Sequence, residues 1–390
     1  MPSLDMYSPT ERSMMTSRER FERCMRFQPV DHVPDMEFSF WDETIRLWER
    51  EGIPRGLDTH QKRELYFGLE RRYKLPIEVN LHPAATVKEA GERGGYRYYY
   101  DEDLVLCRVP ADGSTTMPEH LAYSLKTRDD WENAFKPLLD PQTPGRVPDD
   151  LGALADSLLA RDFVPYVYAG SLFGRIRNFA GFAEICYLIY DDPDLVDEMI
   201  HHMADLSCEV LSQALPRLRG KVCSAHYWED ICFNTGPMVS PEWFRDHVVP
   251  CYCEINELLR AHGIDIIVVD CDGWVGPLVE CWLDAGVNVM FPLERNGGSD
   301  PVMLRKRYGR RVLLMGGVDK TKIAKGGDDM VRELEYFAPL VEEGGFIPHC
   351  DHLVPADVSL DNYRFYLRKK REMFGIPHRE ERVREFPDED

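Results

Sequence analysis

The fold of this 390-residue chain is constrained most by an alternation of short apolar, β-rich segments with helical stretches. A segment such as Ile264 to Asp270 is apolar on both faces, which is typical of a parallel strand that is covered on each side. Eight such segments alternating with helices along one chain predict an α/β fold, a closed TIM-type (β/α)8 barrel. The segments are Val33 to Phe40, Leu75 to Val79, Phe163 to Ala169, Lys221 to Tyr227, Ile264 to Asp270, Val287 to Leu293, Arg311 to Met315 and Gly345 to Pro348.

The alternation is interrupted between residues 82 and 129, where short segments are separated by Gly-rich or acidic turns. This pattern predicts a β-hairpin insertion near the N-terminal part of the barrel. We expect one barrel domain over residues 16–377, a disordered N-terminus over 1–15 and a charged, solvated tail over 378–390. The alternative is a doubly wound sheet with a separate N-terminal domain, although the sequence contains neither a GxGxxG nor a phosphate-cradling GxxxxGK[ST] motif.

Composition narrows the classes of partner. The net charge of −21 disfavours nucleic acid and anionic membrane surfaces as ligands, because no basic patch offsets it. No apolar run is long enough for a membrane span, and the first residues lack the apolar core of a signal peptide, so we expect a cytoplasmic protein. Eleven cysteines scattered without a framework fit reduced thiols better than disulfides.

Carboxylates stand where the predicted strands end, and this is the face of a barrel on which active sites lie. Asp270 and Asp272 end the central strand on a turn closed by Gly273, and Glu229 and Glu294 follow two neighbouring strands. We predict that these four acids are catalytic, with Glu229 or Glu294 handling a proton. The alternative is structural: Asp270 caps the following helix, and Asp272 belongs to an ordinary turn.

A possible metal site follows the last strand. His349, Cys350, Asp351 and His352 offer imidazole, thiolate and carboxylate ligands, which are the usual ligands of zinc. We predict a metal held by a set drawn from His226, Asp270, Asp272, Cys350 and His352. The spacing is unspecific, so the alternative is that these histidines are ordinary side chains of the core or of a loop.

The same face offers candidate substrate-binding residues. These are Glu37 and Tyr168 at strand ends, Tyr227 beside His226, and Arg175, whose guanidinium suits a substrate carboxylate. The alternative for Arg175 is a solvated position at the start of a helix.

Several longer motifs carry a resemblance to a known family. They are RERFERCMRFQPVDHVP, YAGSLFGRIRNFAGF, YWEDICFNTGPMVSPEWFRDHVVPCYCEI, VVDCDG, AGVNVMFPLE, YGRRVLLMGGVDK and CDHLVPADVSLDNYRFYL. In these motifs, which span nearly the whole chain, the sequence resembles the uroporphyrinogen decarboxylase superfamily, which includes cobalamin-dependent methyltransferases. The resemblance implies a TIM-type barrel, in agreement with the strand pattern.

Two departures from the family shape the functional prediction. The decarboxylases carry an arginine signature, RQAGRY, where this chain reads EFSFWDETIR with Glu37 and Asp42, so a substrate with many carboxylates is disfavoured. The zinc methyltransferases carry HxCG at the central strand end, where this chain has Asp270, Cys271, Asp272 and Gly273. Cys350 matches their last cysteine. Zinc bound by one thiolate and two carboxylates favours a donor with an oxygen or nitrogen leaving group over activation of a thiol.

The resemblance therefore predicts a methyltransferase-like enzyme that moves a methyl group between a small substrate and a corrinoid, with a metal such as Zn²⁺ assisting. The chain has no DxHxxG corrinoid motif, so we expect the corrinoid on a separate protein. Family members often pair, so we also expect a homodimer or higher oligomer. One alternative is a cofactor-free decarboxylase or lyase acting on a small carboxylic acid, and another is a non-catalytic binding barrel.

Overall fold

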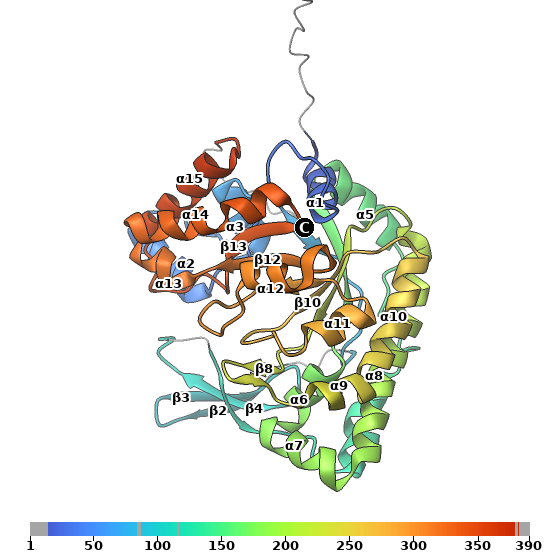
Figure 1. The fold of residues 1–390 in the computed structure, drawn as a ribbon. Helices are drawn as coiled ribbons and strands as arrows, with labels where there is room; N and C mark the ends of the chain where they lie inside the picture. Colours follow the sequence, from blue (N-terminus) through green and yellow to red (C-terminus); the bar gives the residue numbers. More distant parts are fainter. Residues whose placement is uncertain (1–14, 84–86, 115–116, 379–380, 382–390) are drawn as a thin grey trace, which may run out of the picture.

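A seven-stranded parallel sheet forms the centre of the protein, as seen in a computed structural model that describes residues 15–83, 87–114, 117–378 and 381 (Figure 1). The strand order is β1-β6-β7-β10-β11-β12-β13, and each pair of neighbours is parallel. The architecture is therefore mixed α/β with a parallel sheet of the kind found in TIM-like folds. The strands are β1 (Arg72–Lys74), β6 (Val164–Gly170), β7 (Ser224–Trp228), β10 (Ile267–Asp270), β11 (Val289–Phe291), β12 (Leu313–Val318) and β13 (Phe346–Cys350).

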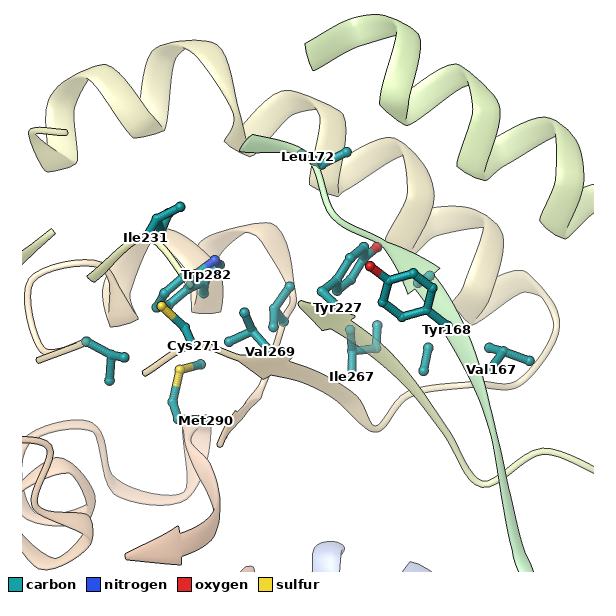
Figure 2. Packing of buried hydrophobic residues seen from close by; sticks show 14 of the residues in the cluster. Val167, Tyr168, Leu172, Tyr227, Ile231, Ile267, Val269, Cys271, Trp282 and Met290 are labelled. Carbon is teal, nitrogen blue, oxygen red and sulfur yellow. The ribbon is translucent and has the colours of Figure 1, made fainter. Parts of the chain in front are cut away.

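Both faces of the sheet are buried, as the apolar composition of the strands predicts. Ile267 and Val269 of β10 pack outward in a large cluster that includes Trp282 of a covering helix (Figure 2). Val268 and its neighbour Ile266 belong to a second cluster on the opposite, inner face. Because side chains alternate along a strand, Asp270 continues the inner row and comes out at the strand end.

Helices cover the outer face. The long helices α8 and α10 run side by side along one flank, and α14 packs against α15 on the other side of the molecule (Figure 1). Their apolar faces supply most of the larger buried cluster. The helices are α1 (Ser17–Met25), α2 (Asp42–Glu51), α3 (His60–Phe67), α4 (Arg128–Asp130), α5 (Leu151–Ala160), α6 (Phe173–Ala180), α7 (Phe182–Asp191), α8 (Pro193–Ala214), α9 (Pro241–His247), α10 (Val249–Ala261), α11 (Val279–Ala285), α12 (Pro301–Tyr308), α13 (Lys320–Lys325), α14 (Gly327–Glu343) and α15 (Leu360–Phe374), with short π or 3-10 turns η1 (Trp131–Phe135), η2 (Lys136–Leu139), η3 (Leu215–Leu218) and η4 (Gly309–Arg311).

Two small antiparallel sheets accompany the parallel one. Residues 88–122 form a four-stranded sheet in the order β2-β3-β4-β5, within the range for which hairpins were predicted. Its strands are β2 (Lys88–Arg93), β3 (Tyr96–Tyr100), β4 (Leu106–Pro110) and β5 (Glu119–Ala122), and a two-stranded ribbon pairs β8 (Cys232–Phe233) with β9 (Gly236–Pro237).

The predicted first strand, Val33 to Phe40, does not form. Within the described residues the segment makes one isolated β-bridge, between Phe40 and Val354, near the edge where β13 ends. Its buried acids bond elsewhere: the Asp35 carboxylate pairs with Lys370 Nζ at 3.0 Å and with Arg371 Nε at 2.8 Å, both from α15. The backbone of the segment also bonds to α15 rather than to a neighbouring strand, since Met36 O accepts from Lys370 Nζ at 3.1 Å. Among the described residues the parallel sheet therefore has seven strands rather than eight.

Most of the other predicted strands overlap with strands of the structure. Six predicted strands coincide with β6, β7, β10, β11, β12 and β13, whereas the strand expected at Leu75 to Val79 is displaced to Arg72–Lys74. A search of the described helices finds none with the length and apolar character required to cross a bilayer. The expected disorder before residue 15 and the expected charged tail lie almost wholly outside the described residues.

Candidate functional site

A pocket of about 470 Å³ opens at the carboxyl ends of β6, β7 and β10. The structure brings five of the predicted site residues to its wall, and adds acidic and basic residues that the sequence did not single out. The lining residues are Lys74, Glu78, Asn80, Leu81, Glu102, Asp103, Tyr166, Tyr168, Arg175, His226, Tyr227, Trp228 and Asp270. A pocket of this volume suits a small molecule.

Strand register explains why these side chains meet. Val268 of β10 pairs with His226 of β7, and Asp270 pairs with Trp228. His226 in turn pairs with Tyr168, so polar residues of adjacent strands form rows at one end of the sheet. The His226 ring lies 4.1 Å from that of Tyr166, measured between centroids, and its Nε2 lies 3.0 Å from Ser224 Oγ.

Asp270 is the most perturbed acid of the pocket. Burial raises its pKa well above the usual value for aspartate, and the nearby carboxylates of Asp272 and Asp230 raise it further. Arg72 acts in the opposite direction but does not outweigh them. Burial and the neighbouring carboxylates therefore favour the protonated form, which is the form that can donate a proton to a bound molecule.

The pocket carries cations as well as acids. Arg175 Nη1 lies 2.9 and 2.8 Å from the two carboxylate oxygens of Asp103, and its guanidinium stacks over Trp228 at 5.0 Å. Asp103 therefore neutralises much of the charge that was expected to bind a substrate carboxylate. Lys74, whose ammonium lies 5.6 Å from the centre of the Tyr168 ring, is a second cation of the wall.

A three-residue cluster lies beside this pocket. Ligand atoms of Asp272, Glu294 and His352 all lie within 4.8 Å of one another. His352 Nε2 is 3.4 Å from Asp272 Oδ2, while the buried Asp272 Oδ1 has no hydrogen-bond partner within the described part of the chain. Burial lowers the pKa of His352, but its hydrogen bond and charge interaction with Asp272 outweigh that effect and raise it.

Hydrogen bonds to Glu294 hold the cluster in place. Glu294 Oε2 accepts a hydrogen bond from Gly273 N at 3.0 Å, and Glu294 Oε1 pairs with Lys320 Nζ at 2.6 Å. Gly273 has φ +74°, and an added Cβ would lie 2.8 Å from the Cys232 carbonyl oxygen, so only glycine fits this turn. The Asp272–Gly273 turn that could have been an ordinary loop thus positions a carboxylate cluster.

These donors fit a divalent metal ion through oxygen and nitrogen. One imidazole and two carboxylates suit a catalytic zinc, manganese or iron site, which needs three protein ligands and an open position. The orphaned Asp272 Oδ1 supports this fit, because a cation would satisfy it. Of the predicted metal ligands, Asp272 and His352 belong to the cluster, and Glu294 joins them.

The other predicted metal ligands lie elsewhere. Cys350 is fully buried, and burial beside Glu37 and Asp351 raises its thiol pKa well above the usual value. Its sulfur does not belong to a metal-binding group in the region that the structure describes, and neither do His226 and Asp270. A thiolate ligand is consequently missing from the cluster, and the donor set is harder than the sequence predicted.

Glu229, which was predicted to be catalytic, makes structural hydrogen bonds. The buried Glu229 carboxylate accepts from the amides of Leu172, Phe173 and Gly174, at 2.7, 3.2 and 2.6 Å, and from Tyr252 Oη at 2.6 Å. Its carboxylate therefore caps the start of α6 from another strand, and this arrangement supports a structural role in place of the predicted proton transfer. A carboxylate at a helix N-terminus is stabilised by the unpaired amides there.

Glu37 and Tyr227 likewise face the protein. Glu37 is fully buried, and its Oε1 accepts from the amides of Phe38 and Cys350 at 3.0 and 2.9 Å, so it does not reach the pocket as a substrate ligand would. Tyr227 touches the pocket wall, but its hydroxyl donates to Asn256 Oδ1 at 2.8 Å in the outer core, where Figure 2 shows it among apolar side chains. Tyr168 lines the pocket, where burial raises the pKa of its hydroxyl and the charge and hydrogen bond of Arg175 act in the opposite direction.

The sequence analysis did not single out Asp103 and Lys74 as site residues. Neither belongs to a motif, and both reach the pocket only through folding.

Comparisons with known proteins add little. No family model matches the chain, and no curated protein matches it. Among solved structures, it is similar to a B12-independent methionine synthase from Shewanella sp. W3-18-1 in complex with selenomethionine, with 13% identity, a TM-score of 0.36, and coverage of 59% of this chain and 67% of that one. So weak a similarity carries no argument about function, which must come from the residues themselves.

Proposed function

We propose that this protein is an enzyme that transfers a methyl group from a small substrate to a corrinoid carried by a separate protein. The observation that carries the proposal is the pairing of a candidate metal cluster, Asp272, Glu294 and His352, with a pocket that contains the raised-pKa acid Asp270. Asp270 joins the two, since it lines the pocket and interacts electrostatically with Asp272.

The residues divide the work as follows. A divalent metal held by the cluster would act as a Lewis acid toward the leaving oxygen or nitrogen of the donor. Asp270, whose burial favours the protonated form, would deliver a proton to that leaving group as the methyl group departs. Tyr166, Tyr168 and Trp228 form an aromatic wall that excludes water and orients the donor.

The open side of the cluster supplies a place for the partner to approach. A hollow of about 380 Å³ is lined by residues 232–235, Asp272, Gly273 and Glu294. At its edge Phe233 is 44% exposed and nearby Trp274 is 41% exposed, although both are large and apolar. Exposed aromatic side chains beside a reactive site are typical of an interaction surface.

A carboxy-lyase is the second candidate. Lys74 and Arg175 could hold the carboxylate of a small acid, and Asp270 could protonate the carbanion left when CO₂ departs. This chemistry uses the pocket but leaves the cluster of Asp272, Glu294 and His352 without a role. The methyltransferase uses both, and for that reason we prefer it.

The test is an anaerobic methyl-transfer assay with the purified protein, free cob(I)alamin and a panel of methyl ethers and methylamines. The absorbance of the corrinoid reports the transfer of the methyl group. We expect transfer from at least one donor, loss of at least about 100-fold in rate for Asp272→Asn, and metal in the wild type by elemental analysis. Transfer that is unchanged in Asp272→Asn refutes the role of the cluster. Release of CO₂ from a small acid without methyl transfer supports the lyase. The absence of both reactions supports a non-catalytic binding barrel.

A further inference from the structure

A second group of metal-ligand side chains lies in the four-stranded sheet, apart from the strand ends. Asp101 directly follows β3, Cys107 lies in β4 and His120 lies in β5. One ligand atom from each residue lies within 4.8 Å of the other two, and Cys107 Sγ is 3.5 Å from Asp101 Oδ2. This sheet is drawn in cyan in Figure 1, away from the helices α14 and α15 that flank the last strand of the parallel sheet.

The sheet itself brings the ligands together. Cys107 and His120 are paired across adjacent antiparallel strands, a position in which Cβ atoms approach to roughly 5 Å. Tyr99 is the partner of Cys107 on the other side, and the chain then continues from β3 to Asp101. Strand pairing therefore fixes Cys107 and His120, and Asp101 directly follows the end of β3.

The Asp101 carboxylate is already oriented. Its Oδ1 accepts hydrogen bonds from the amides of Asp103 and Val105, both at 2.9 Å, which leaves Oδ2 facing Cys107. Outer bonds of this kind are what fix a ligating carboxylate in known metal sites. Cys107 is fully buried while His120 is exposed, so the group is closed on one side and reachable from solvent on the other.

We propose that Asp101, Cys107 and His120 form a binding site for a thiophilic divalent metal ion, zinc above all, with water in the fourth position. Sulfur, imidazole and carboxylate together are the ligand set of tetrahedral zinc. The site is separate from the Asp272 cluster, which offers no sulfur. On binding, the Cys107 S–H bond breaks, a sulfur–metal bond forms, and the proton passes to solvent.

The site has a consequence for the pocket. The loop of Asp101 to Val105 supplies Glu102 and Asp103 to the pocket wall, and Asp103 in turn holds Arg175. Within the loop, the Asp101 carboxylate accepts two amides and the Cys107 thiol, and the Asp101 amide donates to Val105 O at 3.0 Å. A metal would tie this loop to β4 and β5 and so hold the Asp103–Arg175 pair in place.

Cobalt substitution tests the proposal on the full chain. A cysteine thiolate bound to Co²⁺ gives an intense ligand-to-metal charge-transfer absorption, which a site made only of oxygen and nitrogen cannot give. We expect one equivalent of Co²⁺ per chain to produce this absorption in the wild type. It should also appear in Asp272→Asn and Cys350→Ser, which makes the result independent of the proposed function.

The deciding variants are Cys107→Ser and His120→Ala. Each should abolish the thiolate absorption, or weaken Co²⁺ binding by more than the roughly 10–100-fold that follows loss of an outer partner. His120 is exposed, so its removal should leave the fold intact, and circular dichroism of both variants is the check. An absorption that is absent from the wild type, or that persists in Cys107→Ser, overturns the proposal, and so does a His120→Ala variant that binds Co²⁺ as tightly as the wild type. Each of these results leaves a plain hydrogen bond between Cys107 and Asp101.

Discussion

Glu229→Ala should destabilise the protein strongly, because Glu229 is a buried cap rather than an exposed strand-end acid. Its carboxylate accepts three backbone N–H groups at the start of α6 and the hydroxyl of Tyr252. Alanine leaves these donors buried without acceptors, at about 1–3 kcal/mol for each unsatisfied group. The loss is offset in part because the costly burial of the carboxylate also disappears, so we expect a net cost of about 3–5 kcal/mol.

Glu229→Gln probes the same site with little change in shape. The amide presents one oxygen and one NH₂ group where the carboxylate presented two acceptors, so at least one of the amides of Leu172, Phe173 and Gly174 loses its partner. We expect a cost of about 1–3 kcal/mol in the free energy of unfolding.

Urea unfolding followed by far-ultraviolet circular dichroism measures both variants, with Asp272→Asn as the matched control. Asp272 is partly exposed and lies 3.4 Å from His352, so its replacement should change stability by less than about 1 kcal/mol while activity is lost. The reasoning is refuted if Glu229→Gln unfolds like the wild type and yet is inactive, because that result would return Glu229 to a catalytic role.

Three further predictions concern stability and assembly. Burial raises the pKa of Glu37 to about 7 from 4.5, so the folded state binds an extra proton between these pH values. The free energy of unfolding should therefore fall by about 3 kcal/mol as pH rises from about 4.5 to 7. Glu37→Gln, which mimics the protonated acid, should flatten this slope in urea titrations at several pH values. Gly174→Ala should unfold at markedly lower urea concentration, since the new Cβ would lie 2.0 Å from the Glu229 carbonyl oxygen, whereas Gly152→Ala, whose nearest contact is 3.2 Å, serves as the milder comparison. Light scattering should show a dimer or larger species, and a mass of 45.2 kDa alone would contradict the expected oligomer.

The strands that the sequence identified correctly share one property: an unbroken apolar run that a parallel sheet buries on both faces. Ile267 and Val269 pack outward and Val268 packs inward, so the run itself encodes the strand. The segment Val33 to Phe40 has a similar apolar content but is not a strand, because its acids bond to α15 and to the end of β13. Those partners lie more than three hundred residues away, and no local pattern reports them.

For the candidate site, the sequence indicated the face on which the pocket and the cluster lie, but it could not assign roles to the residues there. Asp272, Glu294 and His352 come from three different strand ends, and the rule that strand ends carry function was enough to select them. The same rule selected Glu229 and Cys350, which the fold turns inward. Whether a strand-end side chain faces solvent or a neighbouring helix depends on packing, as the cap that Glu229 provides to α6 illustrates.

Methyl transfer and decarboxylation would both use Asp270, but only methyl transfer would use Asp272. This difference follows from the position at which β10 ends. Asp270 occupies the last inner position of the strand, so it faces the pocket and gains its raised pKa from burial and from nearby carboxylates. Asp272 lies beyond the strand, on the turn that Gly273 allows, and so reaches Glu294 and His352 instead. A proton donor at Asp270 serves either a departing methyl donor or a carbanion, whereas the buried Asp272 oxygen without a hydrogen-bond partner among the described residues is a group that a bound cation would satisfy. The cluster, and not the pocket, therefore favours metal-assisted transfer.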